Sequence, residues 1–204
     1  MWDSRLGIVR SLAHAMAAVG LNARSDDELI GEIGPPLTVM LANVGVAPER
    51  IDEARDLYRN RYHAVGVYEC ELYPGIVTLL EELRTAGWQL ATATSKGSVA
   101  TELMIDHFEL RRYFDVVASA SMDSSSHSKV DVIRRALAGL APNPDSTPVM
   151  IGDRHYDIDG ARDQGLTSVG VLWGYGSRPE LESAGADHIV ADIDELRTVL
   201  TTQL

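Results

Sequence analysis

The sequence predicts an α/β fold with a mostly parallel sheet, into which an all-helical segment is inserted. From about residue 73 onward, short apolar runs alternate with amphipathic segments, which is the pattern of strands and helices in βα units. Before that point the chain shows only helical periodicity. A length of 204 residues suffices for one α/β core and a smaller inserted domain. We expect residues 1–11 and 72–204 to form the core and residues 12–71 to form the helical domain.

The N-terminal third is predicted to be a series of helices separated by prolines and glycines. Asp3 and Ser4 precede apolar residues at helical spacing and are residue types that cap helices, so a first helix is expected from residue 5. Ser25 precedes another amphipathic segment in the same way. Further helices are expected over residues 25–33, 36–45 and 48–66.

The remainder of the chain is predicted to alternate between helices and buried strands. Helices are expected over residues 75–87, 99–108, 129–140 and 157–165. Strands are expected over residues 88–95, 114–121, 147–153 and 167–174, and residues 188–200 are expected to form a short strand and a closing helix. A serine-rich loop is predicted between the second of these strands and Lys129.

Composition excludes several classes of function. A net charge of −12 argues against a nucleic-acid partner and against an anionic membrane surface. No apolar run approaches the roughly 20 residues that a membrane span needs. Cys70 is the single cysteine, so no internal disulfide can form, which suits a reducing cytoplasm. An anionic small substrate remains compatible with the acidic chain, because a local cation or metal can invert the field inside a cleft.

Polar side chains follow three of the predicted strands, where ligands of open parallel sheets gather. The first strand runs into Thr94, Ser95 and Lys96, Lys129 comes after the second, and Asp153 ends the third. Asp157 lies one helical turn after Asp153 on the same face. The chain has 16 arginines and only two lysines, both in this set, and a compact ammonium suits a tight phosphate site.

Each of these residues also fits an ordinary structural role. Asp153 could cap the following helix, with Asp157 as a solvated acid of its first turn. Thr94 and Ser95 could cap a helix after a strand, and Lys129 could be a solvated lysine near a helix start. Together, however, a hydroxyl, an ammonium and paired carboxylates describe a metal-assisted phosphoryl site. Two carboxylates form a hard-oxygen site suited to Mg²⁺, which keeps several of its waters.

The chain resembles the phosphoglycolate phosphatase-like branch of the haloacid dehalogenase superfamily. The segments that carry the resemblance are "LATATSKG", "SASMDSSSHSKVDVIRRAL", "VMIGDRHYDIDGARDQG" and "GVLWGYG", together with "IGPPL" in the helical segment. It implies a Rossmann-like core and a helical cap. It also implies that Thr94 and Lys129 contact the transferring phosphoryl group, with Ser95 and Lys96 beside it. Asp153 would bind Mg²⁺, with Asp157 next to it or acting through water.

The first motif of that family, D-x-D-G-T-[LM]-x-D-S, is represented only by its tail, Met1-Trp2-Asp3-Ser4. In the family the first aspartate attacks phosphorus and the second is the general acid and base. We expect the natural protein to have roughly a dozen further residues that supply this motif and a first core strand. In the alternative, the chain begins at Met1 and lacks both the nucleophile and that strand.

The resemblance implies a Mg²⁺-dependent phosphomonoesterase that acts on a small phosphorylated metabolite. We expect 2-phosphoglycolate first and nucleoside monophosphates second as substrates. One alternative is a catalytically silent protein that still binds phosphate or Mg²⁺. Another is phosphotransfer to or from protein side chains, since some relatives of this branch carry a protein-tyrosine kinase name. No glycine-rich ATP loop is present in the sequence, so this alternative ranks last.

Overall fold

The computed structural model describes residues 1–121, 128–143 and 146–202, and the predicted serine-rich loop lies mainly outside them. The chain divides into two compact units. Unit 1 consists of residues 1–73 and 102–108, and unit 2 consists of residues 74–101 and 109–204. Unit 1 includes the whole of the predicted helical domain. The assignment of residues 12–71 as a cap, in the functional sense, stays a prediction.

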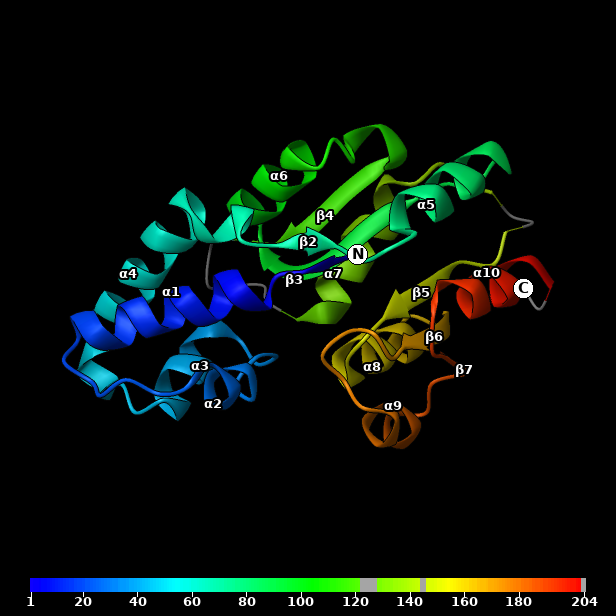
Figure 1. The fold of residues 1–204 in the computed structure, drawn as a ribbon. Coiled ribbons are helices and arrows are strands. Elements are labelled where there is room, and N and C mark those ends of the chain that lie inside the picture. The colour runs from blue at the N-terminus through cyan, green and yellow to red at the C-terminus, as the bar shows by residue number, and fades with distance from the viewer. Residues whose placement is uncertain (122–127, 144–145, 203–204) are drawn as a thin grey trace. The chain divides into compact units, whose positions relative to one another are not determined.

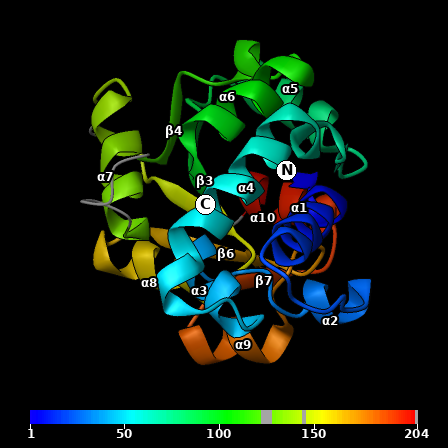
Figure 2. The same cartoon turned by 90° about the vertical axis from the view of Figure 1, so that its left-hand side faces the viewer.

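Unit 1 is mainly helical. Helices α1 (Arg5–Ala18) and α4 (Ile51–Ala64) run side by side (Figures 1 and 2). The other elements are α2 (Asp26–Ile30), α3 (Leu37–Asn43), two 3₁₀ turns (Pro48–Arg50 and Gly66–Tyr68) and the strands β1 (Trp2–Asp3) and β2 (Glu71–Leu72). The predicted cap at Ser25 is confirmed, because its hydroxyl accepts the Glu28 amide and the Glu28 carboxylate accepts the Ser25 amide.

Two features of unit 1 differ from the sequence-based expectation. β1 and β2 pair antiparallel, with Trp2 opposite Leu72, where only helices were expected before residue 73. Each strand has two residues, too few for alternation to be visible in the sequence. Leu6 is one of the apolar residues at helical spacing that predict the first helix, yet it is 44% exposed.

Gly7 lies directly against the backbone of a neighbouring turn, since a Cβ on Gly7 would come 2.0 Å from the carbonyl oxygen of Gly66. We therefore expect Gly7→Ala to lower the free energy of unfolding by about 1–3 kcal/mol, because neither backbone can move away cheaply. Gly31→Ala is the control, since its Cβ would meet nothing closer than 3.4 Å. Urea unfolding measures both variants, and equal stability of the two would contradict the expected clash.

Unit 2 contains the parallel strands that the sequence predicts. Strands β3 (Ala91–Gly97) and β4 (Val116–Ala120) pair parallel with each other. Strands β5 (Val149–Gly152), β6 (Thr167–Val171) and β7 (His188–Val190) form a second parallel sheet in that order. Among the described residues no ladder joins β3 to β5. The predicted α/β class with parallel strands is thus confirmed, with the strands divided between two sheets.

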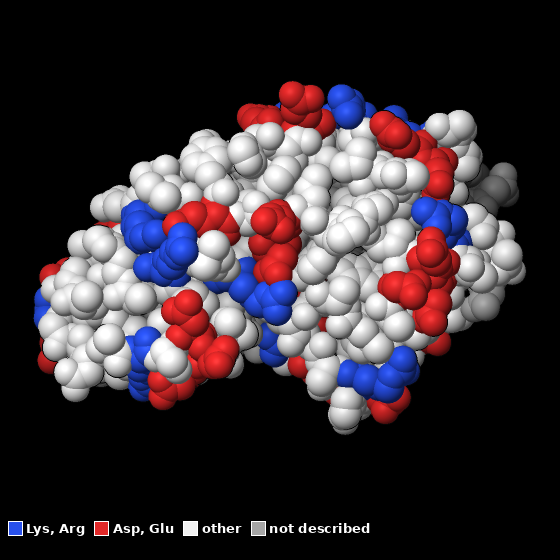
Figure 3. Space-filling model, viewed as in Figure 1, with Lys and Arg blue, Asp and Glu red and all other residues white. Residues whose placement is uncertain are grey.

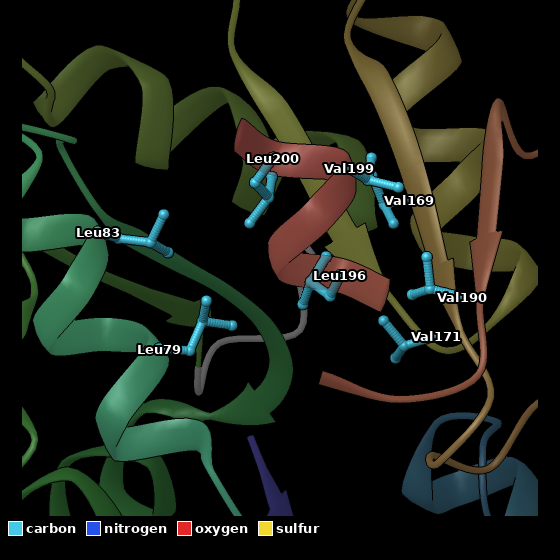
Figure 4. Close-up of a cluster of buried hydrophobic side chains, with 8 residues drawn as sticks. All are labelled: Leu79, Leu83, Val169, Val171, Val190, Leu196, Val199 and Leu200. Carbon is cyan, nitrogen blue, oxygen red and sulfur yellow. The ribbon is translucent and has the colours of Figure 1, made fainter. Parts of the chain in front are cut away.

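Helices surround these strands and complete the hydrophobic core of unit 2. Side chains of α5 and α10 pack against β6 and β7 in one buried cluster, formed by Leu79, Leu83, Val169, Val171, Val190, Leu196, Val199 and Leu200 (Figure 4). The helices are α5 (Ile76–Thr85), α7 (Lys129–Gly139), α8 (His155–Asp163), α9 (Arg178–Ala184) and α10 (Ile193–Thr202), while α6 (Ser98–His107) starts in unit 2 and continues in unit 1.

Helix α7 connects the two sheets of unit 2. It packs on β3 and β4, and it lies next to α8, which covers β5 and β6 (Figure 2). Ile133 of α7 belongs to a cluster that also contains Met150 of β5 and is packed by Ala93 of β3. This packing brings the ends of β3 and β5 to the same helix, α7, whose first residue is Lys129.

Candidate active site

The predicted site residues all belong to unit 2, at the ends of β3 and β5 and the start of α7. Ser128 caps α7, since its hydroxyl accepts the Asp131 amide at 3.1 Å. Lys129 is therefore held at the first position of the helix, where the helix dipole disfavours a cation. A carboxylate partner compensates for this position.

That partner is Asp157. The Lys129 Nζ lies 2.6 Å from Asp157 Oδ1, and the two side chains are only 10% and 9% exposed. The same ammonium donates to the carbonyl oxygen of Ala93 in β3. Both residues are therefore parts of a buried ion pair. The alternatives of a solvated lysine and a solvated first-turn acid are wrong.

Asp157 also organises the turn between β5 and α8. Its Oδ2 accepts the amides of Asp153 at 2.9 Å and of Arg154 at 3.1 Å. The adjoining strand has to end in glycine, because a Cβ on Gly152 would lie 2.2 Å from the Cβ of Asp157. Both oxygens of Asp157 thus have protein partners, and it is Asp157, rather than Asp153, that caps the start of α8.

Asp153 has a different environment. Its Oδ2 accepts the Tyr175 amide at 2.7 Å, whereas no hydrogen bond to its Oδ1 is found within the described part of the chain. Burial raises the pKa of the Asp153 carboxyl, the nearby charge of Asp157 adds to this, and the Tyr175 amide and the Lys129 ammonium oppose it. A half-buried carboxylate with one unused oxygen is a suitable ligand for a cation.

The donor set of this site fits Mg²⁺. This ion is bound through one or two carboxylates and keeps several waters, so the free oxygen of Asp153 meets the minimum requirement. In residues 1–121, 128–143 and 146–202, no group of three or more His, Cys, Asp and Glu residues could hold a metal.

The residues at the end of β3 are less constrained. Thr94 Oγ1 accepts the Lys96 amide at 3.1 Å, Ser95 is exposed and Lys96 is half-buried. Ala93, which precedes Thr94, contacts Lys129 through its carbonyl. The contacts thus connect the end of β3 to the turn after β5 through Lys129 and Asp157. The roles of Thr94, Ser95, Lys96, Lys129, Asp153 and Asp157 in binding and catalysis stay predictions.

Two parts of the site were not predicted as site residues. The first is the loop after β6, where a Cβ on Gly174 would lie 2.3 Å from Asp153 Cβ and one on Gly176 would lie 1.9 Å from the Asp153 carbonyl oxygen. The glycines of "GYG" in the sequence are the signal for this close approach. The second is Glu180 of α9, which accepts Arg154 Nε at 2.7 Å and His155 N at 3.0 Å.

The charge on Glu180 is held in place by its partners. Burial raises the pKa of its carboxyl, but hydrogen bonds from Arg154 and His155 and the Arg154 charge outweigh this and bring the pKa to about 2.

On the face that Figure 3 shows, acidic and basic side chains lie in small mixed groups rather than in one basic patch. No helix in the described residues is long and apolar enough to cross a membrane.

Comparisons with known proteins agree with the predicted resemblance. The family model described as haloacid dehalogenase-like hydrolase matches residues 1–171. The tyrosine-protein kinase PtkA of Mycobacterium tuberculosis is 41% identical over 200 residues, covering 97% of this chain and 68% of that protein. A 5′-nucleotidase of Pseudomonas aeruginosa is 36% identical over 201 residues, covering 97% of this chain and 90% of that protein.

Solved structures of related proteins show the same resemblance. The crystal structure of a predicted phosphatase from Clostridium acetobutylicum matches with a TM-score of 0.89 at 36% identity, covering 98% of this chain and 93% of that one. The resemblance and the fold class predicted from the sequence are thereby confirmed.

Proposed function

Because this chain belongs to the haloacid dehalogenase-like hydrolase family and resembles its phosphatases, we propose that it is a Mg²⁺-dependent phosphomonoesterase for small phosphorylated metabolites. The observation that carries the proposal is the buried Lys129–Asp157 pair, which is connected to Ala93 on one side and to the Asp153 turn on the other. A buried ion pair costs desolvation energy and adds little stability, so a role in binding anions accounts for it better than a role in folding. The proposal includes a cytoplasmic location, which a chain with one cysteine suits.

The proposed roles follow from the chemistry of each side chain. The Lys129 ammonium neutralises phosphoryl oxygens, and the Thr94 hydroxyl donates a hydrogen bond to one of them. Ser95 and Lys96 border the phosphate. Asp153 would hold Mg²⁺ through Oδ1, with Asp157 acting through water or through the turn that it organises. When bound, the ion would neutralise charge that develops on the phosphoryl group.

In the proposed reaction a carboxylate oxygen attacks phosphorus, the bond from phosphorus to the ester oxygen breaks, and the leaving alcohol takes a proton from a general acid. Water then hydrolyses the resulting aspartyl-phosphate to free phosphate. The resemblance assigns these steps to the two aspartates of the first family motif, of which Met1-Trp2-Asp3-Ser4 resembles the tail. The intact mass of the protein from its native source, compared with 22.2 kDa, tests whether further residues supply the rest of that motif.

The activity test uses the same native protein. We expect it to release phosphate from 2-phosphoglycolate or from nucleoside monophosphates in Mg²⁺, and to lose this activity when EDTA removes the metal. The second substrate class gains support from the 36% identical 5′-nucleotidase. No Mg²⁺-dependent release from any member of the panel would overturn the proposal. Stabilisation by inorganic phosphate or Mg²⁺ without turnover would then favour the silent binding protein.

Phosphotransfer to or from protein tyrosine is a second candidate, which the 41% identity to a protein named tyrosine-protein kinase PtkA favours. A tyrosine-phosphorylated peptide belongs in the phosphatase panel for this reason, and ATP with the unphosphorylated peptide tests the opposite direction. Transfer of phosphate from ATP to the peptide, with no release from the small phosphate esters, would support this candidate over the phosphomonoesterase.

A further inference from the structure

Glu180 of α9 holds the turn that carries Asp153. A single oxygen, Oε1, accepts three hydrogen bonds, from Arg154 Nε at 2.7 Å, from the His155 amide at 3.0 Å and from His155 Nδ1 at 2.8 Å. The side chain is 23% exposed. Its position is set by the start of its own helix, where the Ser177 hydroxyl accepts the Glu180 amide. Glu180 is therefore fixed on one element and bonded to another that lies 25 residues earlier in the chain.

Three consecutive amides of the turn donate to two carboxylates. The amides of Asp153 and Arg154 donate to Asp157, and the amide of His155 donates to Glu180. Asp157 belongs to the helix that the turn begins, whereas Glu180 reaches the turn from outside it. With both carboxylates in place, the backbone that follows Asp153 is fixed from two directions. These bonds hold the backbone that carries the Asp153 side chain, and the Tyr175 amide donates to its Oδ2 at 2.7 Å.

The packing of α9 does not depend on this charge. Leu181 is fully buried and, with Ala184, belongs to a hydrophobic cluster that includes Ile158 of α8. These apolar contacts keep α9 against α8 whether or not residue 180 is acidic. The ion pair of Glu180 with Arg154 joins half-buried groups, whose contribution to stability is modest. The acidic group is thus more useful to the turn than to the fold.

We infer that Glu180 is a positioning residue of the active site, which aims Asp153 at the metal and so sets the affinity of the protein for Mg²⁺. This inference rests on the proposed function. Residues that orient a metal ligand through hydrogen bonds typically change metal affinity or activity by about 10–100-fold when they are replaced. Glu180 would have an effect of this kind without contacting either the ion or the substrate.

The test measures Mg²⁺ binding by titration calorimetry, without substrate, on the full chain and its variants. Glu180→Ala is expected to weaken binding by about 10-fold or more. Glu180→Gln keeps an oxygen that can accept the His155 amide, so a smaller loss is expected. Glu182→Ala is the matched control, because Glu182 lies on the same helix, its side chain is 57% exposed, and its ion pair with Arg178 is long, at 3.8 Å. It is expected to bind Mg²⁺ like the wild type.

Amide hydrogen exchange supplies a readout that does not depend on the metal. Faster exchange at His155 in Glu180→Ala, with Glu182→Ala unchanged, is expected if Glu180 holds the turn. Wild-type Mg²⁺ affinity in Glu180→Ala, with or without a lower melting temperature, would overturn the inference and leave Glu180 a structural residue. If the wild type itself binds no Mg²⁺, the proposed function fails and the inference fails with it. The titration of the wild type therefore distinguishes this case from one in which only the role of Glu180 is wrong.

Discussion

Replacing Lys129 by methionine is expected to lower the free energy of unfolding by about 3–5 kcal/mol and to abolish phosphatase activity. Methionine matches the length of the lysine stem but removes the ammonium. Asp157, with a side chain only 9% exposed, would keep its charge in a buried place and, among the described residues, retain the amides of Asp153 and Arg154 as partners. A buried carboxylate without a cation destabilises the folded state by much more than an exposed one does.

Urea unfolding measures this effect, and Arg134→Met on the same helix is its control. Arg134 also pairs with an aspartate, at 2.7 Å from Asp131, but its side chain is 61% exposed. Exposed pairs of this kind contribute about 0.2–1 kcal/mol. If the two variants lost similar amounts of stability, the Lys129–Asp157 pair would not behave as a buried ion pair, and the main support for the proposed function would be lost.

The carboxylate partner of Lys129 illustrates how much of the site the sequence predicts. A lysine at the start of a helix is unfavourable on its own, so a ligand or a carboxylate nearby could be expected from local rules. The sequence also places Asp153 and Asp157 one turn apart. The sequence does not show that one oxygen of Asp157 contacts Lys129 while the other accepts amides of the turn, because this depends on how α7 packs against α8.

The contacts of Glu180 and the pairing of β1 with β2 could not be predicted from local sequence patterns. Ser177, Pro179 and Gly185 are ordinary signals for the start and end of a helix, and α9 lies between Ser177 and Gly185, a segment for which the sequence analysis predicts no element. The bonds from Glu180 to a turn 25 residues away depend on tertiary packing, which no local spacing encodes. The β1–β2 pair likewise joins residues about 70 positions apart through strands too short to show alternation.

Asp153→Asn is expected to remove Mg²⁺-dependent turnover while making the metal-free protein more stable at neutral pH. Burial raises the pKa of Asp153, so the ionised carboxylate disfavours the folded state near pH 7. Asparagine keeps an oxygen for the Tyr175 amide but carries no charge. The melting temperature of the metal-free variant should therefore be higher than that of the wild type. Turnover should fall by about 100-fold or more, because bound metal supplies several kcal/mol of charge stabilisation.

The stability difference between Asp153→Asn and the wild type is expected to depend on pH. A raised pKa in the folded state means that the folded protein binds the proton more tightly than the unfolded chain does. The stability that Asp153 contributes is therefore complete below its ordinary pKa of 3.8 and is lost as the pH rises through the higher folded value. The higher stability of Asp153→Asn relative to the wild type should appear as the pH rises through the folded-state pKa of Asp153, and it should vanish in acid.

Thermal unfolding with and without Mg²⁺ separates the two consequences of this change. Mg²⁺ should raise the melting temperature of the wild type and leave that of Asp153→Asn unchanged, since a ligand stabilises only the state that binds it. Asp159→Asn is the control, because Asp159 lies on α8 with a 43% exposed side chain paired to Arg162. An equal Mg²⁺ shift in wild type and Asp153→Asn would show that the metal binds elsewhere. A lower melting temperature of metal-free Asp153→Asn than of the wild type would show that the ionised Asp153 carboxylate does not destabilise the folded protein.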